Sequence, residues 1–162
     1  EAALVFGASR VFAVDRIPAR LAAAAALGAV PLQPEAAAEA ILAATGGLGV
    51  DSVIEAVGAD ASIQLALQLA RPAGVVSVVG VNVRLDFPFP MALALMKNLT
   101  FRIGICPIPE LWPELIPLVQ AGRLHPERVF THRLPLSQGS DAYRLFDEKR
   151  DGVLKVLLDP RG

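Results

Sequence analysis

Several residue types that build common functional sites are scarce in this chain. It has one cysteine, Cys106, in 162 residues, which excludes an internal disulfide framework and a cysteine-rich zinc site made by this chain alone. The two histidines, His125 and His132, lack metal-ligand spacing, and no serine or cysteine is placed to complete a catalytic triad with them. We therefore predict no catalytic and no metal-binding residue in this sequence.

Long apolar runs and an excess of charge of one sign are also missing. Hydrophobic residues make up 54% of the chain and its mean hydropathy is +0.50, yet no window offers the roughly 18 uninterrupted apolar residues that a membrane helix needs. The net charge is −1, and the mixed, dispersed charges do not form the basic stripe of a nucleic-acid-binding protein. We expect neither a membrane nor a nucleic acid as partner, and the single cysteine fits a reducing, cytoplasmic setting.

Strand-like and helix-like segments alternate along the chain. Residues 1–7 have the pattern of the last turns of a helix capped by Gly7, so we expect the chain to begin within an element. The predicted strands are 10–14, 29–32, 53–57, 75–81, a strand near 99–105, 129–134 and 153–158. The predicted helices between them are 18–27, 35–44, 60–70 with Asp60 as its cap, 110–121 and 139–148. These spacings suit parallel right-handed crossovers and predict a doubly wound α/β sheet.

The strand at 10–14 ends on a carboxylate, Asp15. In a dinucleotide-binding βαβ unit, an acidic residue at the carboxyl end of the second strand accepts hydrogen bonds from the adenosine ribose. The commoner role for such an aspartate is a helix cap, but Pro18 at the first helical position moves the cap to Ile17. Asp15 is therefore a candidate ribose ligand.

Two arginines near Asp15 bear on the choice of cofactor. A 2′-phosphate site usually has an arginine without a facing carboxylate, because two negative groups repel each other, so Asp15 favours NAD over NADP. Arg16 leaves that preference open, and Arg20, about one helical turn on, could reach the adenosine side. A surface arginine is the ordinary alternative for Arg20.

A glycine-rich phosphate loop is not found in its expected place. The near match at residues 47–52 precedes a predicted strand, whereas a pyrophosphate loop must follow a strand and open a helix. We interpret TGGLGVD, residues 45–51, as a turn. The glycine loop and the first strand are expected before residue 1.

Two glycines follow predicted strands, where a nucleotide would approach the sheet. These are Gly58 and Gly80, and their neighbours Val57, Val79 and Val81 offer main-chain groups and an apolar wall. Ordinary turn chemistry explains either glycine alone equally well. Together with Asp15 they mark three successive strand ends, and this favours a nucleotide site.

The segments VFAVD, TGGLGVDSVIEAVG, LARPAGVVSVVGV and GVLKVLLDP, in this order, resemble the medium-chain dehydrogenase/reductase superfamily. The similarity is to its zinc-dependent alcohol dehydrogenase branch, in the subgroup related to formaldehyde dehydrogenase. The resemblance implies a Rossmann-like doubly wound parallel sheet that lacks its first strand and glycine loop. It implies a partial dinucleotide-binding domain over residues 1–126, and residues 127–162 as a C-terminal segment that returns to the catalytic domain.

The resemblance also implies roles for individual residues. Asp15 would bind the ribose with Arg20 near it, Val57 and Gly58 would line the adenine side, and Val79, Gly80 and Val81 would border the nicotinamide. The backbone of Ile105 and Cys106 would approach the carboxamide, and Lys155 would reach the cofactor phosphates. The family's zinc ligands would belong to a missing N-terminal half, and the strand near 99–105 would pair across a dimer axis in a homodimer or a higher homo-oligomer.

The parent protein implied by this resemblance transfers hydride between a small alcohol or aldehyde and NAD, while this chain alone would be inactive. Two alternatives stay open at this point. One is a zinc-free relative of the quinone-reductase type, and the other is a non-catalytic nucleotide-binding or oligomerisation module.

Overall fold

The computed structural model describes all 162 residues, which divide into two compact units. One unit comprises Leu32–Ile108, and the other comprises Glu1–Pro31 together with Pro109–Gly162. The predicted domain boundary after residue 126 concerns the domains of a whole enzyme, and it stays a prediction. None of the helices is both long and apolar enough to cross a membrane.

The unit 32–108 is built on a three-stranded parallel sheet in the order β3-β4-β5. Its strands are β3 (Val50–Glu55), β4 (Ala70–Val78) and β5 (Thr100–Ile103). The central strand β4 contains the β-branched run around Val75 and Val76, a composition that suits a strand covered on its faces. Parallel pairing puts the carboxyl ends of β3 and β4 at the same edge of the sheet.

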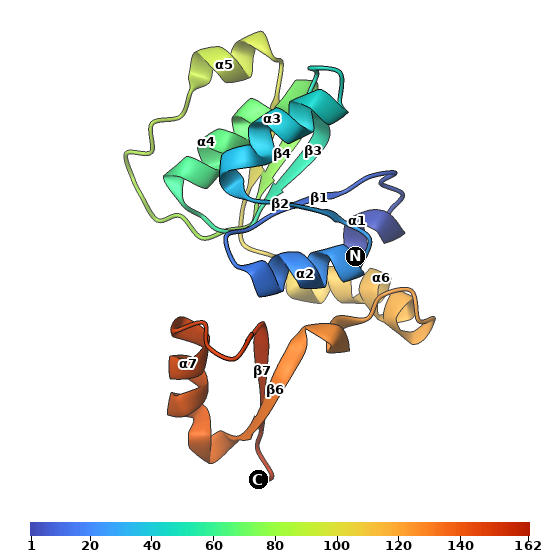
Figure 1. The fold of residues 1–162 in the computed structure, drawn as a ribbon, viewed down its shortest axis with the longest axis vertical. Helices are drawn as coiled ribbons and strands as arrows, with labels where there is room; N and C mark the ends of the chain where they lie inside the picture. Colours follow the sequence, from blue (N-terminus) through green and yellow to red (C-terminus); the bar gives the residue numbers. More distant parts are fainter. The chain divides into compact units, whose positions relative to one another are not determined.

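Three helices belong to this unit: α3 (Pro34–Ala44), α4 (Asp60–Leu69) and α5 (Met91–Met96). Helix α4 packs on β3 and β4, as Figure 1 shows, and α3 packs beside α4. Its apolar face buries Ile63, Ala66 and Leu67 against Val76 and Val78 of β4, each at most 3% exposed. This cluster is the core that holds the strand ends in place.

The end of α4 is held by Lys97, the residue that follows α5. Lys97 Nζ donates hydrogen bonds to the carbonyl of Gln68, in the last turn of the helix, at 2.6 Å, and to the carbonyl of its C-cap residue Ala70, at 2.8 Å. Partial burial lowers the pKa of the Lys97 ammonium group. These bonds satisfy carbonyl groups that a helix end otherwise leaves unpaired.

We expect Lys97→Met to destabilise the chain by about 1 kcal/mol, because both carbonyls lose their donor while the apolar stem is largely kept. Urea unfolding followed by circular dichroism measures the change. Lys155→Met is the matched control, since Lys155 is exposed on a strand of the other unit and should change the unfolding midpoint little. Equal effects of the two substitutions would contradict this account of Lys97.

The other unit contains two small sheets. Strands β1 (Phe12–Val14) and β2 (Val30–Leu32) pair with each other, and β6 (Phe130–Pro135) runs parallel to β7 (Lys155–Asp159). Its remaining elements are α1 (Ala2–Val5), α2 (Pro18–Ala26), α6 (Ile108–Gln120), α7 (Gly139–Asp147) and the short 3-10 helices η1 (Pro126–Val129) and η2 (Leu136–Gln138).

Most predicted elements are present, and the differences fall at their ends. Helix α2 begins at Pro18 with Ile17 as N-cap, as predicted, and Gly7 follows the end of α1 with a positive φ of 96°. Strand β3 ends at Glu55 and β4 at Val78, two and three residues earlier than predicted. Residues 56–58 and 79–81 therefore lie in turns beyond the strands.

The prediction that Asp60 caps α4 is wrong. The N-cap is Ala59, and no side chain caps the helix there. The Asp60 carboxylate instead accepts a hydrogen bond from Asn82 Nδ2, at 2.9 Å, and pairs with Arg84. The negative charge of an aspartate at the first helical position still interacts favourably with the helix N-terminus. The local sequence therefore does not distinguish an N-cap residue from a first helical residue.

Candidate functional site

The carboxyl ends of β3 and β4 are joined by backbone hydrogen bonds. The carbonyl oxygen of Glu55, the last residue of β3, accepts from Val79 N at 2.8 Å and from Gly80 N at 3.1 Å. The turn after β4 is therefore fastened to the end of β3. This brings together the five residues Val57, Gly58, Val79, Gly80 and Val81, which we call the strand-end surface.

The side chain of Glu55 lies beneath this surface and is only 4% exposed. Its Oε1 accepts hydrogen bonds from Val57 N at 2.9 Å, Gly58 N at 3.0 Å and Ser62 Oγ at 2.8 Å. Its Oε2 also lies 3.0 Å from Gly58 N. All its partners are donors, which suits an ionised carboxylate because it can only accept hydrogen bonds.

Glu55 is not among the site residues predicted from the sequence. The signal was present, because Glu55 is the one charged residue in the otherwise apolar run VIEAV at 53–57. A charge inside a buried strand requires compensation by hydrogen bonds or by an opposite charge. Such a residue could have been chosen from the sequence on that ground alone.

Neighbouring atoms lie so close to Gly58 and Gly80 that only glycine fits at these two positions of the strand-end surface. A Cβ on Gly58 would lie 2.3 Å from the carbonyl oxygen of Val81, and Gly58 has a φ of +81°. A Cβ on Gly80 would lie 2.2 Å from Gly58 N and 2.8 Å from Glu55 Oε2. The two turns therefore pack directly on one another, which ordinary turn chemistry at either position does not demand.

The outer side of this surface is apolar and exposed. The side chains of Val57, Val79 and Val81 are 71%, 53% and 82% exposed. Exposed valines grouped around closely packed backbone offer a contact surface for a flat apolar group such as an aromatic ring. Their main-chain carbonyls could accept hydrogen bonds from such a ligand.

Asp15 follows β1 directly and lies at the start of α2. Its Oδ1 accepts a hydrogen bond from Ile17 N at 2.9 Å, and its Oδ2 lies 3.7 Å from Arg20 Nη1. The side chains of Asp15 and Arg20 are each about one third exposed. A carboxylate has about four acceptor positions, so Asp15 keeps capacity for a ligand beyond these two local contacts.

The remaining predicted site residues lie on the surface. Arg16 is exposed beside Asp15, and Lys155 is exposed at the start of β7. Ile105 and Cys106 follow β5 and are exposed, with the side chain of Ile105 97% exposed. The structure thus groups the five residues of the strand-end surface, and separately Asp15 with Arg20. It groups the other four predicted residues, Arg16, Ile105, Cys106 and Lys155, with neither set.

The loop after the strand-end surface is anchored by charges. Arg84 pairs with Asp60 at the start of α4 and with Asp86, whose carboxylate is 2.8 Å away. The Arg84 guanidinium holds the pKa of the Asp86 carboxyl below its ordinary value. The loop is therefore tied to the start of α4, where Asn82 also donates a hydrogen bond to Asp60. Phe87 and Phe89 of this loop are among the residues that line a small hollow of about 100 Å³.

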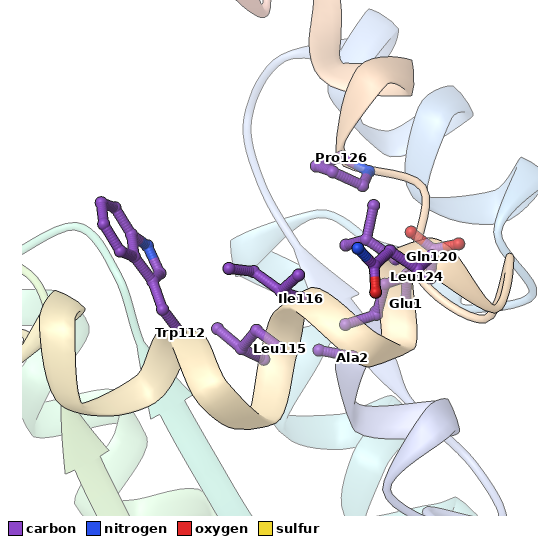
Figure 2. A pocket seen from close by; sticks show the side chains of 9 residues that line it. Glu1, Ala2, Trp112, Leu115, Ile116, Gln120, Leu124 and Pro126 are labelled. Atoms are coloured by element: carbon purple, nitrogen blue, oxygen red, sulfur yellow. The ribbon is translucent and has the colours of Figure 1, made fainter.

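A larger hollow of about 480 Å³ lies along α6 in the other unit. Figure 2 shows Trp112, Leu115 and Ile116 of α6 on one side of it, with Glu1 and Pro126 nearby. Its wall is almost entirely apolar, and none of the predicted site residues lines it. The hollow offers apolar contact area but has few polar groups that would orient a ligand.

The chain does not assemble a metal site. No group of three or more histidine, cysteine, aspartate or glutamate side chains is placed to hold a metal ion. Zinc in proteins is held by three or four such ligands. We therefore assign no zinc ligand to these residues and derive no step through a metal.

Comparison with known proteins identifies the family. A family model described as zinc-binding dehydrogenase matches residues 1–121, which is most of the chain. This chain belongs to the zinc-binding dehydrogenase family. The match confirms the resemblance to zinc-type alcohol dehydrogenases, while the subgroup related to formaldehyde dehydrogenase stays a prediction.

Individual alcohol dehydrogenases resemble the chain over nearly its whole length. The "Probable zinc-binding alcohol dehydrogenase" of Mycobacterium tuberculosis is 47% identical over 99% of this chain, which covers 41% of that protein. The solved alcohol dehydrogenase TADH from Thermus sp. ATN1 is 46% identical over 97% of the chain and 45% of its own, with a TM-score of 0.89. A solved NAD-dependent alcohol dehydrogenase is 26% identical over 98% of the chain and 46% of its own, with a TM-score of 0.81.

These structural matches confirm the predicted fold class, a Rossmann-type α/β architecture with parallel sheets. The chain spans less than half the length of these alcohol dehydrogenases.

Proposed function

We propose that this chain is the NAD-binding part of a zinc-type alcohol dehydrogenase, and that the whole enzyme transfers hydride between a small alcohol or aldehyde and NAD. The observation that carries the proposal is Asp15, a partly exposed carboxylate at the end of β1 and ahead of α2. Its setting suits a group that accepts hydrogen bonds from the adenosine ribose. When bound, NAD accepts or gives up the hydride.

The comparisons support this proposal through the family and through the NAD-dependent alcohol dehydrogenase that shares the fold. A carboxylate at the ribose position also repels a 2′-phosphate, which favours NAD over NADP. Arg20 holds the carboxylate from one side by charge and leaves its other lone pairs open.

The other predicted site residues take their proposed roles from the family resemblance. Val57 and Gly58 would line the adenine side, and residues 79–81 the nicotinamide. Ile105 and Cys106 would offer backbone groups to the carboxamide, and Lys155 a positive charge to the phosphates. The exposure of Val57, Val79 and Val81 supports this assignment, because a flat ring gains most by covering apolar side chains that water otherwise wets.

The proposal has three further parts that concern the whole enzyme. Its catalytic zinc would be held outside these residues, so the chain by itself would show no turnover of alcohol. The enzyme would be a homodimer in which β5 lies at the dimer axis, and the 61% exposure of Ile103 on β5 is in keeping with that role. The single free cysteine supports a cytoplasmic setting.

Titration of the chain with NADH, followed by the fluorescence of the reduced nicotinamide, tests the proposal. We expect saturable binding of NADH, weaker binding of NADPH, and an affinity for NADH at least about tenfold lower in Asp15→Ala, since charge-assisted hydrogen bonds to the ribose are lost. The affinity of Asp15→Asn for NADH should lie between that of the unsubstituted chain and that of Asp15→Ala, because an amide oxygen can still accept a hydrogen bond from Ile17 N.

Asp147→Ala is the matched control, because Asp147 is an exposed aspartate at the end of α7. Its affinity for NADH should equal that of the unsubstituted chain. Tight, saturable binding that survives Asp15→Ala would show that the ribose site is misplaced. Oxidation of an alcohol by the chain alone would refute the part of the proposal that puts the catalytic groups elsewhere.

A further inference from the structure

We infer that Glu55 is a positioning residue for the nucleotide: its buried carboxylate fixes the two turns that form the strand-end surface. The inference rests on the proposed function, because that surface is where the bases of the dinucleotide would lie. Glu55 itself is only 4% exposed and would not touch the ligand. Its effect would pass through Val57, Gly58 and Gly80.

Glu55 uses up the N–H donors of the turn after β3. The N–H groups of Val57 and Gly58 both point to its carboxylate, at 2.9 and 3.0 Å. They are therefore not available to a phosphate or another anion. With both N–H groups turned inward, the turn presents to a ligand the exposed apolar side chain of Val57, a suitable surface for a neutral planar group.

Glu55 alone holds both turns. The Glu55 backbone carbonyl accepts from Val79 N and Gly80 N, while its side chain holds Val57 and Gly58. Its Oε2 would lie only 2.8 Å from a Cβ on Gly80, so carboxylate, turn and glycine are in direct contact. A shift of the carboxylate would move the two turns relative to each other.

The burial of a charged side chain at Glu55 points to a role beyond stability. Burying a carboxylate costs free energy unless donors surround it, and a buried charge that serves stability alone can usually be replaced by an apolar side chain. Here the turn donors and the Ser62 hydroxyl, at 2.8 Å, compensate the carboxylate. The arrangement therefore specifies one geometry of the turn, which is what a surface that recognises a rigid ligand needs.

The test compares NADH binding and amide hydrogen exchange in the chain and in Glu55→Gln. Glutamine keeps the size of the side chain but can put an NH2 group against the N–H donors of the turn. We expect the affinity for NADH to fall by about tenfold and the Val57 and Gly58 amides to exchange faster. At saturating NADH, the emission of the bound cofactor should move toward that of free NADH, which lower stability alone would not produce.

Thr45→Val is the matched control. Thr45 Oγ1 accepts from Gly49 N at 3.0 Å and so fixes the turn that precedes β3, at the opposite end of that strand. This substitution should speed exchange at Gly49 and leave the affinity for NADH unchanged. A fall in affinity equal to that of Glu55→Gln would mean that general destabilisation explains both, and would overturn the inference.

Ser62→Ala keeps the inference testable if Glu55→Gln does not fold. It removes one donor to the carboxylate and should weaken NADH binding by about threefold. Unchanged affinity in Glu55→Gln, or in Ser62→Ala where only that variant folds, overturns the inference and leaves the proposed function intact. If the unsubstituted chain binds no NADH, the proposed function fails and this inference fails with it.

Discussion

Gly80→Ala is expected to destabilise the chain by about 3 kcal/mol or more. The new Cβ would lie 2.2 Å from Gly58 N, 2.7 Å from the carbonyl carbon of Val57 and 2.8 Å from Glu55 Oε2. Two of these atoms are backbone, and the third belongs to a carboxylate held by three donors, so none can move cheaply. The variant must therefore separate the turns after β3 and β4, losing hydrogen bonds at both.

Urea unfolding measured by circular dichroism gives the size of this effect, and NADH titration should show a parallel loss of affinity. Gly104→Ala is the control, because Gly104 lies just after β5 with no atom within 4 Å of the added Cβ. It should change the free energy of unfolding by no more than about 0.5 kcal/mol. A Gly80→Ala variant as stable as the Gly104→Ala variant would contradict the close packing described for these turns.

Leu67→Ala is the second substitution with a large expected effect, a loss of about 3 kcal/mol in the free energy of unfolding. Leu67 is fully buried in α4 and packs in the cluster with Ile63, Val76 and Val78. Removing three carbons leaves a cavity whose neighbours cannot collapse, because they are fixed in the helix and the central strand. Urea unfolding provides the measurement.

Leu95→Ala makes the same chemical change at a site that is 78% exposed in α5. It should alter the free energy of unfolding by no more than about 0.5 kcal/mol. Since α4 also carries Ser62, Leu67→Ala should disturb the strand-end surface as well as the core. Equal unfolding midpoints for the two leucine variants would show that α4 does not form the core of the unit 32–108.

Much of the fold could be predicted from the sequence because local signals agree with the tertiary structure. Pro18 at the first position of α2, Gly28 after its end and the valine-rich run of β4 each favour one backbone conformation on their own. The turn predicted at 45–51 is present over residues 45–49, where Gly46, Gly47 and Gly49 all have positive φ, while Val50 and Asp51 already belong to β3. Such positions need no information from distant parts of the chain.

The strand ends and the role of Glu55 could not be predicted in this way, because they depend on neighbours far along the chain. Strand β3 ends where its last residue turns its carboxylate toward Val57 and Gly58 and its carbonyl toward Gly80. A run of apolar residues continues past that point, so periodicity alone extends the strand to Val57. Asp60 was misjudged for a similar reason, since its partner Arg84 is 24 residues away.

The position of Trp112 has a practical consequence for any study of this chain in solution. It is the only tryptophan in the sequence, and it lies on α6, outside the unit 32–108 that carries Glu55, Gly80 and Leu67. Its side chain is 55% exposed, so indole emission reports on the surroundings of α6. Far-ultraviolet circular dichroism averages over both units. Coincident unfolding transitions by indole emission and by dichroism would indicate that the two units unfold as one cooperative body, and separate transitions would indicate two steps.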